Sequence, residues 1–421
     1  MLATVLLAGP AGKLPVTIPA NLLARLRPHG LLLSPWLAVG MGSVAILVGT
    51  ITVARIRRRR RADRGVRGVA GVGGATVLIA VSLATATAVN SFVGYIPTIA
   101  SLGQLAGVTS LGQAIGSPAV AGSLAATGML ANGWPVGVGR TVSFNLGDPG
   151  LGVPVSTGYV YLPPGYDSQP DRHYPVVYLL HGFPGGAQDW MRAGRVADTM
   201  NLLVANHVLP PMIIVAPDVN GGRFRDGGCL NAVGGPQITT YLLRDVLGWV
   251  DSHLRTLISP AQRAIGGMSS GGYCALDIGL RATGLFGVLL AFQPYGDPGL
   301  SVLPGILAGR TDVYRAHSPT VYLPFMTFVR RPAIFLDSGD ASRAEVRRVR
   351  ALYQLIAARK LDAAFRIETG QSHTWLEARA GLPWGLLFAA RHFPDTTAPA
   401  GARPSIRLAG TAARTVHARW P

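Results

Sequence analysis

Charged residues and cysteines are both scarce in this chain of 421 residues. Only 14% of the residues are charged, against roughly 25% in a typical soluble protein. Apolar residues make up 49%, and the mean hydropathy is +0.33. These values exclude an intrinsically disordered protein, which is rich in charge and poor in apolar residues. The two cysteines are too few for a disulfide-dense scaffold or a cysteine-based zinc site.

Acidic residues are almost absent from the first third of the chain. Residues 1–134 contain eleven Lys and Arg but a single acid, Asp63, and eight of these basic residues lie within 55–67. A nucleic-acid-binding protein would carry a basic face with interleaved aromatic residues. Here the arginine block lies between two apolar stretches, so we expect a membrane and no nucleic acid as the partner.

Two uncharged stretches are long enough to cross a membrane. They are residues 31–54 and 68–89, which are 24 and 22 residues long; about 20 helical residues cross the roughly 30 Å of hydrocarbon. The arginine-rich segment 55–67 between them is predicted to be a cytoplasmic loop, because short basic loops stay in the cytoplasm. Both ends of this hairpin then lie outside the cytoplasm, and the protein is predicted to be a multi-pass plasma-membrane protein.

The composition divides the chain into five segments. We expect an extracytoplasmic segment at 1–30, the transmembrane hairpin at 31–89, and a linker rich in Gly, Ala, Ser and Leu at 90–139. A catalytic domain is predicted at 140–395 and a tail at 396–421. The catalytic domain is therefore expected to be extracytoplasmic.

Within the predicted catalytic domain, short apolar runs alternate with helical patterns. This alternation predicts an α/β fold with a mostly parallel sheet and helices on both faces. Strands are expected at 158–162, 175–180, 212–216, 263–268, 288–292, 333–337 and 364–368.

The most specific motif is Gly-Met-Ser-Ser-Gly-Gly at 267–272. It matches G-x-S-x-G between a predicted strand and a predicted helix, as a nucleophile elbow requires. A structural Gly-rich turn is the alternative. We predict that Ser269 is a nucleophile and that Ser270 supplies a backbone N–H to an oxyanion.

A second loop, His-Gly-Phe-Pro-Gly-Gly at 181–186, directly follows a predicted strand. In α/β-hydrolases this loop supplies the other oxyanion N–H. Phe183 is the predicted donor, since Pro184 has no N–H. A simple strand-to-helix turn is the alternative, and we expect a structural role for His181.

The general base should follow the last strand, because the triad order is serine, acid, histidine. His373 fits that place, whereas His392 lies at the far end of the following helix. Three acids qualify by order, and we favour Asp340, in the loop after a strand, over Glu345 and Asp337. Glu345 has a structural explanation as part of a capping box with Ser342.

Several segments together resemble the putative esterase family, which includes esterase D, feruloyl esterases and the antigen 85 mycolyltransferases. The segments are YVYLPPGYD, VVYLLHGFPGGAQDW, IIVAPD, TTYLLRDV, GGMSSGGYCAL and GQSHTWLE. The likeness covers about residues 140–395 and is greatest to actinobacterial members with an N-terminal membrane hairpin. It implies an α/β-hydrolase fold with Ser269 as nucleophile, His373 as base, and Phe183 and Ser270 as oxyanion donors.

The resemblance leaves the acid open. Mycolyltransferases carry a Glu six residues after a Gly, which corresponds to Glu345 after Gly339. Esterases of the family usually carry an Asp about three residues after that Gly, where this chain has Ser342. The mycolyltransferases also have an acid where this chain has His181, which is a departure from their pattern.

The predicted function is a membrane-anchored, extracytoplasmic serine esterase that needs no metal and no cofactor. A hairpin anchor favours an ester of a lipid or cell-envelope component as substrate. One alternative is an acyltransferase that passes the acyl group to a sugar or lipid alcohol, and another is a non-catalytic envelope-binding hydrolase fold.

The two cysteines, Cys229 and Cys274, are predicted to form a disulfide. Both lie in the part of the chain placed outside the membrane, where oxidising conditions favour pairing. Two buried free thiols are the alternative.

Overall fold

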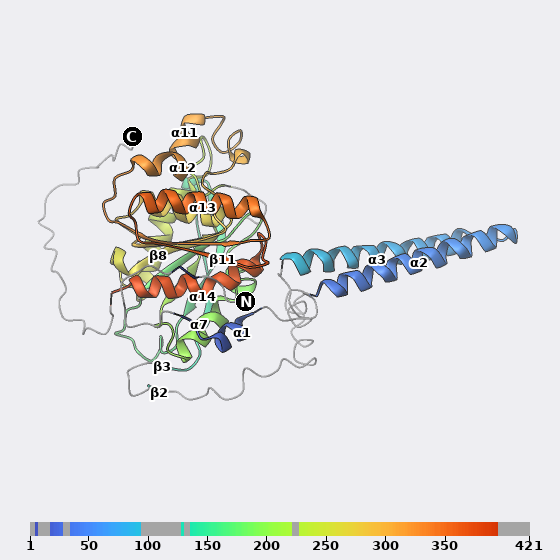
Figure 1. Ribbon diagram of the computed structural model, residues 1–421, viewed down its shortest axis with the longest axis horizontal. Helices are drawn as coiled ribbons and strands as arrows, with labels where there is room; N and C mark the ends of the chain where they lie inside the picture. Colours follow the sequence, from blue (N-terminus) through green and yellow to red (C-terminus); the bar gives the residue numbers. More distant parts are fainter. Residues whose placement is uncertain are drawn as a thin grey trace, which may run out of the picture.

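The computed structural model describes residues 5–6, 17–27, 34–93, 128–129, 135–220 and 227–394. A pair of long helices extends to one side of an α/β domain (Figure 1). Most of the predicted linker and the whole predicted tail lie outside the described residues.

The two long helices, α2 (Pro35–Arg61) and α3 (Arg67–Val93), run beside each other (Figure 1). Their close approach depends on Gly73, where a Cβ would lie 2.2 Å from Cγ2 of Thr52. Both helices are long and apolar enough to cross a membrane, and nearly all of their surface is exposed. One expectation is corrected here. The arginines before Ala62 continue helix α2 instead of forming a loop from residue 55, because arginine is a strong helix former.

Among the described residues, the sheet of the α/β domain has nine strands in the order β1-β11-β10-β9-β8-β6-β7-β5-β4. The six strands from β11 to β7 are parallel, whereas β4 and β5 at one edge and β1 at the other pair antiparallel. The strands are β1 Val5–Leu6, β4 Arg140–Asp148, β5 Val153–Leu162, β6 Val176–Leu180, β7 Ile213–Ala216, β8 Arg263–Met268, β9 Val288–Phe292, β10 Ala333–Gly339 and β11 Ala363–Glu368. Strands β2 (Gly128–Met129) and β3 (Pro135–Val136) form a separate ribbon.

Helices cover both faces of the sheet, with a hydrophobic core on each side, and Figure 1 shows α13 and α14 on opposite faces. One face carries α8 (Ile238–Tyr241), a π-helical turn (Leu242–Val246), α9 (Leu247–His253), α10 (Ser270–Arg281) and α13 (Arg343–Ala358). The other carries α1 (Ala20–Leu26), α6 (Gln188–Arg192), α7 (Val196–Ala205) and α14 (Trp375–His392). The predicted α/β-hydrolase fold is therefore confirmed.

A smaller layer follows β9 in the sequence. It contains α11 (Thr311–Ala316) and α12 (Pro319–Tyr322), and it is held by a satellite cluster of buried apolar side chains that includes Leu230, Val302 and Leu307. Short 3₁₀ turns complete the domain at Pro149–Leu151, Pro260–Gln262, Leu300–Val302 and Leu323–Phe325.

Helix α1 precedes the long helices in the sequence but packs on the α/β domain. Ile18, Leu22 and Leu26 are buried in the core that α7 and α14 share. The buried guanidinium of Arg379 donates a hydrogen bond from Nε to the carbonyl of Leu26, at 3.1 Å. The chain therefore leaves this domain through α2, returns through α3, and meets the same domain again.

A disulfide joins Cys229, in the connection after β7, to Cys274 on α10, with the two Cα atoms 5.7 Å apart. It closes a loop of 45 residues. The bond ties a surface connection to the helix that begins immediately after Ser269.

Candidate active site

Ser269 lies on a sharp turn between strand β8 and helix α10. The backbone φ of Ser269 is +60°, a value that residues other than glycine rarely adopt. The neighbouring glycines make the turn possible, because a Cβ on Gly267 would lie 2.2 Å from the carbonyl oxygen of Gly271. A Cβ on Gly271 would lie 2.3 Å from the carbonyl oxygen of Leu180. The spacing of the glycines therefore reflects backbone contacts at the turn, which is the geometry of a nucleophile elbow.

His373 lies in the connection between β11 and α14, where its ring reaches the elbow. Its Nε2 is 2.8 Å from Oγ of Ser269. About a quarter of its side chain is exposed (27%), so the ring borders the solvent. At this distance the imidazole can accept the proton of the serine hydroxyl.

Nδ1 of His373 is hydrogen-bonded to the carboxylate of Glu345. Glu345 lies in the first turn of α13 and is 5% exposed. The hydroxyl of Ser342 accepts a hydrogen bond from the amide of Glu345 at 3.4 Å, so the serine half of the predicted capping box is present. The other half is absent, since the Glu345 carboxylate turns to the histidine.

The other two candidate acids contact other groups. Asp340 is exposed at the end of β10, and its Oδ1 accepts a hydrogen bond from the amide of Gly370 at 2.6 Å. Asp337 is fully buried inside β10, where both of its oxygens accept hydrogen bonds from Arg366, at 2.9 and 3.0 Å. Of the three acids, only Glu345 contacts His373 among the described residues.

The two predicted oxyanion donors flank Ser269. Ser270 is the first residue of α10, and the N–H groups of a helix's first turn have no acceptor inside the helix. The loop that contains Phe183 reaches the elbow through Gly182, where a Cβ would lie 3.2 Å from Cβ of Ser269. Both predicted donors therefore belong to segments that adjoin the serine.

The side chains of the other two histidines considered contact other residues. His181 is fully buried, with Nδ1 2.9 Å from the carbonyl oxygen of Gly182 and Nε2 3.1 Å from the amide of Val219. His392 is at the far end of α14 and contacts Asp362 at 2.9 Å. Among the described residues, neither ring is hydrogen-bonded to Ser269.

Tyr295 is a neighbour of the site that the sequence patterns did not single out. Its hydroxyl oxygen lies 3.3 Å from Oγ of Ser269 and 3.2 Å from Nε2 of His373. The only signal in the sequence is its place three residues after strand β9, which lies beside β8 in the sheet. The loops at the carboxyl ends of parallel strands converge at such sites.

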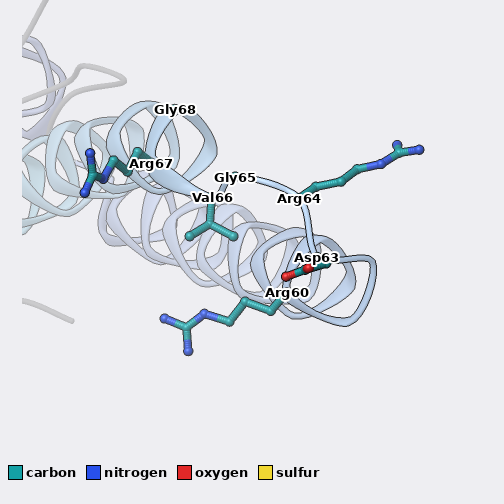
Figure 2. A pocket seen from close by; sticks show the side chains of 7 residues that line it. All are labelled: Arg60, Asp63, Arg64, Gly65, Val66, Arg67 and Gly68. Atoms are coloured by element: carbon teal, nitrogen blue, oxygen red, sulfur yellow. The ribbon is translucent and has the colours of Figure 1, made fainter.

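A separate hollow lies at the turn between α2 and α3, lined by Arg60, Asp63 and residues 64–68. Figure 2 shows the side chains of Arg60, Arg64 and Arg67 pointing in different directions. They do not converge on a common point, so this hollow is not a built anion site. Among the residues that the structure describes, no group of three or more His, Cys, Asp or Glu could hold a metal ion.

The fold and the elbow together define an α/β-hydrolase, with a serine at the end of a central strand and a histidine after the last strand. The family model named putative esterase matches residues 155–374, more than half of the chain. The chain belongs to this family.

Three similar proteins illustrate the match. A solved ferulic acid esterase is 26% identical with a TM-score of 0.55, covering 61% of this chain and 100% of that one. An S-formylglutathione hydrolase from Agrobacterium tumefaciens shares the fold. It is 20% identical with a TM-score of 0.51, covering 61% of this chain and 96% of that one. Esterase Rv1288 of Mycobacterium tuberculosis is 31% identical over 127 residues, which are 30% of this chain and 26% of that protein. The chain spans less than half the length of the first curated relatives that it matches.

Proposed function

We propose that this protein is a serine esterase in which Ser269, His373 and Glu345 form the catalytic triad. The observation that carries the proposal is the 2.8 Å contact between Oγ of Ser269 and Nε2 of His373 at a nucleophile elbow. His373 removes the proton of Ser269 as the oxygen attacks the ester carbonyl. Glu345 orients the imidazole and stabilises its charged form. The amides of Phe183 and Ser270 hold the oxyanion, and water resolves the acyl-enzyme.

The membrane hairpin supports a lipid or cell-envelope ester as substrate. Helix α1 is docked on the α/β domain beside the first half of α14, through Arg379. His373 lies two residues before Trp375, the first residue of α14. Only residues 28–33 separate the docked segment from the residues that begin α2, so the first span starts within about 25 Å of Arg27. A substrate that resides in the membrane would therefore meet the catalytic domain close to its anchor.

The same arrangement supports an extracytoplasmic catalytic domain. A hairpin returns the chain to the side from which it left, and α1 and the α/β domain share one core. The arginines at the turn favour the cytoplasm for that end. The disulfide between Cys229 and Cys274 is typical of a compartment outside the cytoplasm.

Acyl transfer is the second candidate, and the position of Glu345 favours it. A Glu six residues after Gly339 is the acid that the resemblance to mycolyltransferases implies. The chemistry is shared up to the acyl-enzyme, which an alcohol then resolves instead of water.

The test is hydrolysis of p-nitrophenyl esters of graded acyl length by the purified full chain and by Ser269→Ala. We expect a loss of at least about 10³-fold in kcat/KM for the variant. Ser252→Ala, which removes an exposed hydroxyl from α9, is the matched control and should leave hydrolysis unchanged. Hydrolysis retained in Ser269→Ala would contradict the proposal. Adding sugar or lipid alcohols to the same assay distinguishes transfer from hydrolysis by its products.

A further inference from the structure

Tyr295 is held in place by contacts to both halves of the proposed triad. The amide of Ser269 donates to the carbonyl of Phe292 at 2.9 Å, which ties the end of β9 to the elbow. The side chain of Gln293, fully buried, donates from Nε2 to the carbonyl of Ser372 at 2.7 Å, which ties the next residue to the histidine loop. Tyr295 follows two residues later, so its position is fixed relative to both groups.

The tyrosine ring and the imidazole of His373 are stacked, with an angle of 13° between their planes and 5.6 Å between their centroids. The hydroxyl oxygen lies 3.2 Å from Nε2 of His373 and 3.3 Å from Oγ of Ser269. These two atoms also define where the leaving oxygen must be, since it departs from the carbon that Oγ attacks and takes its proton from Nε2. The hydroxyl of Tyr295 therefore borders the place of the leaving oxygen.

We propose that Tyr295 is a further catalytic residue, whose O–H donates a hydrogen bond to the leaving alcohol oxygen. The proposal rests on the serine-esterase function proposed above. As the tetrahedral intermediate collapses, the bond from carbon to the leaving oxygen breaks and its electron pair stays on that oxygen. The proton on Nε2 of His373 moves to the oxygen, while Tyr295 keeps its own proton and stabilises the developing negative charge. In the second step the acceptor oxygen occupies the same place, and the same O–H orients it.

This role predicts a dependence on the leaving group. An alkyl alcohol is a weak acid, so its departing oxygen carries a high charge density and gains much from a hydrogen bond. A nitrophenolate spreads its charge over the ring and gains little. A residue that only supports the imidazole would affect both classes of ester equally, because His373 is needed for both.

The experiment compares Tyr295→Phe with the unmodified chain on esters that share one acyl group and range from p-nitrophenyl to ethyl. The measured quantity is kcat/KM, which reports steps up to acylation. We expect a loss of about 10- to 100-fold for the ethyl ester, the range for a hydrogen bond to a charged group. For the p-nitrophenyl ester we expect a change within about twofold.

Tyr353→Phe is the matched control, since this tyrosine lies on α13 with its ring against Phe365, and it should leave the whole series unchanged. An equal loss in Tyr295→Phe across all esters, or no loss, would overturn the proposal and leave a stacking role only. Activity that survives Ser269→Ala would instead overturn the esterase function itself, so the two failures are distinguishable.

Discussion

At the scale of single residues, the carboxylate that contacts His373 lies in the first turn of a helix instead of directly after a strand. Asp340, at the strand end, is engaged by the amide of Gly370. Glu345 lies in the first turn of α13, and its amide donates to the hydroxyl of Ser342 while its carboxylate reaches the histidine. A triad acid only orients and stabilises the imidazole, so different elements can supply it.

The first prediction concerns this acid. Glu345→Gln should lower kcat by about 10²- to 10⁴-fold, because the amide neither stabilises the imidazolium nor fixes its tautomer. Asp340→Asn is the comparison, since its carbonyl oxygen can still accept the hydrogen bond from Gly370, and it should stay within about threefold of the unmodified chain. The measurement is steady-state hydrolysis of a p-nitrophenyl ester. A larger loss in Asp340→Asn than in Glu345→Gln would reverse the assignment.

The second prediction concerns Glu377, which is fully buried on α14 beside Asp337. Burial, and then the neighbouring Asp337 carboxylate, raise the pKa of Glu377 well above its usual range. Above the unfolded pKa of about 4.3, the unfolded chain loses this proton while the folded protein keeps it. Its contribution to the free energy of unfolding therefore falls as the pH rises from about 4.3 toward the raised folded pKa.

Glu377→Gln should remove this loss, since glutamine does not titrate. The variant should therefore gain in free energy of unfolding, relative to the unmodified chain, as the pH increases. Chemical denaturation of the detergent-solubilised protein at several pH values measures the difference. A difference that is independent of pH would show that Glu377 is ionised in the folded protein.

At the scale of elements, helix α14 approaches the sheet closely through glycines spaced by one turn. A Cβ on Gly381 would lie 1.6 Å from Oδ2 of Asp337, and one on Gly385 would lie 2.7 Å from the ring of Phe292. Asp337 is fixed by Arg366, so it cannot yield to an added methyl group. The helix that begins just after His373 is therefore positioned by backbone contact with the sheet.

The third prediction follows from this contact. Gly381→Ala should destabilise the fold by about 3 kcal/mol or more, because overpacking here also displaces a buried ion pair. Gly248→Ala is the control on α9, where a Cβ meets nothing within 4 Å. It should be neutral or stabilise by up to about 1 kcal/mol, through the better helix propensity of alanine. Thermal unfolding of both variants gives the comparison, and equal stabilities would contradict the tight packing of α14.

At the scale of the whole molecule, the hairpin is attached to the α/β domain at two points in the sequence. The docked helix α1 precedes it, and strand β4 follows it. Leu22 and Arg379 make the first attachment a packed one. Such an attachment restrains the domain relative to the two long helices more than a single flexible linker would.

The fourth prediction is the topology. Protease added to intact spheroplasts should digest the catalytic domain, because the proposed orientation places it outside the cytoplasm. A cytoplasmic protein in the same cells is the control and should stay intact. Digestion of the catalytic domain only after lysis would place it in the cytoplasm. A cysteine introduced at Gly65, in the turn between α2 and α3, should react with an impermeant maleimide only after lysis.

The sequence by itself determined the features that local chemistry and periodicity encode. The seven predicted strands each overlap a strand of the sheet. Six of them belong to its parallel part, where strands buried on both faces read as short apolar runs. The elbow at Ser269 was readable because its turn excludes side chains at Gly267 and Gly271. The two long apolar helices were readable because each comes from an uncharged run of more than 20 residues, at 31–54 and 68–89.

The tertiary structure alone decided which side chains meet. It brought Glu345 to His373, because a glutamate in a first helical turn reads as a cap until the neighbouring loop is placed. It placed Tyr295 beside Ser269. No sequence motif marks this tyrosine, and its contact with the serine depends on the adjacency of β8 and β9. It docked α1 on the domain that follows the hairpin, a contact between Leu26 and Arg379 that spans 353 positions. Local patterns carry no information about such distant pairs, which packing and hydrogen bonding select only in the folded chain.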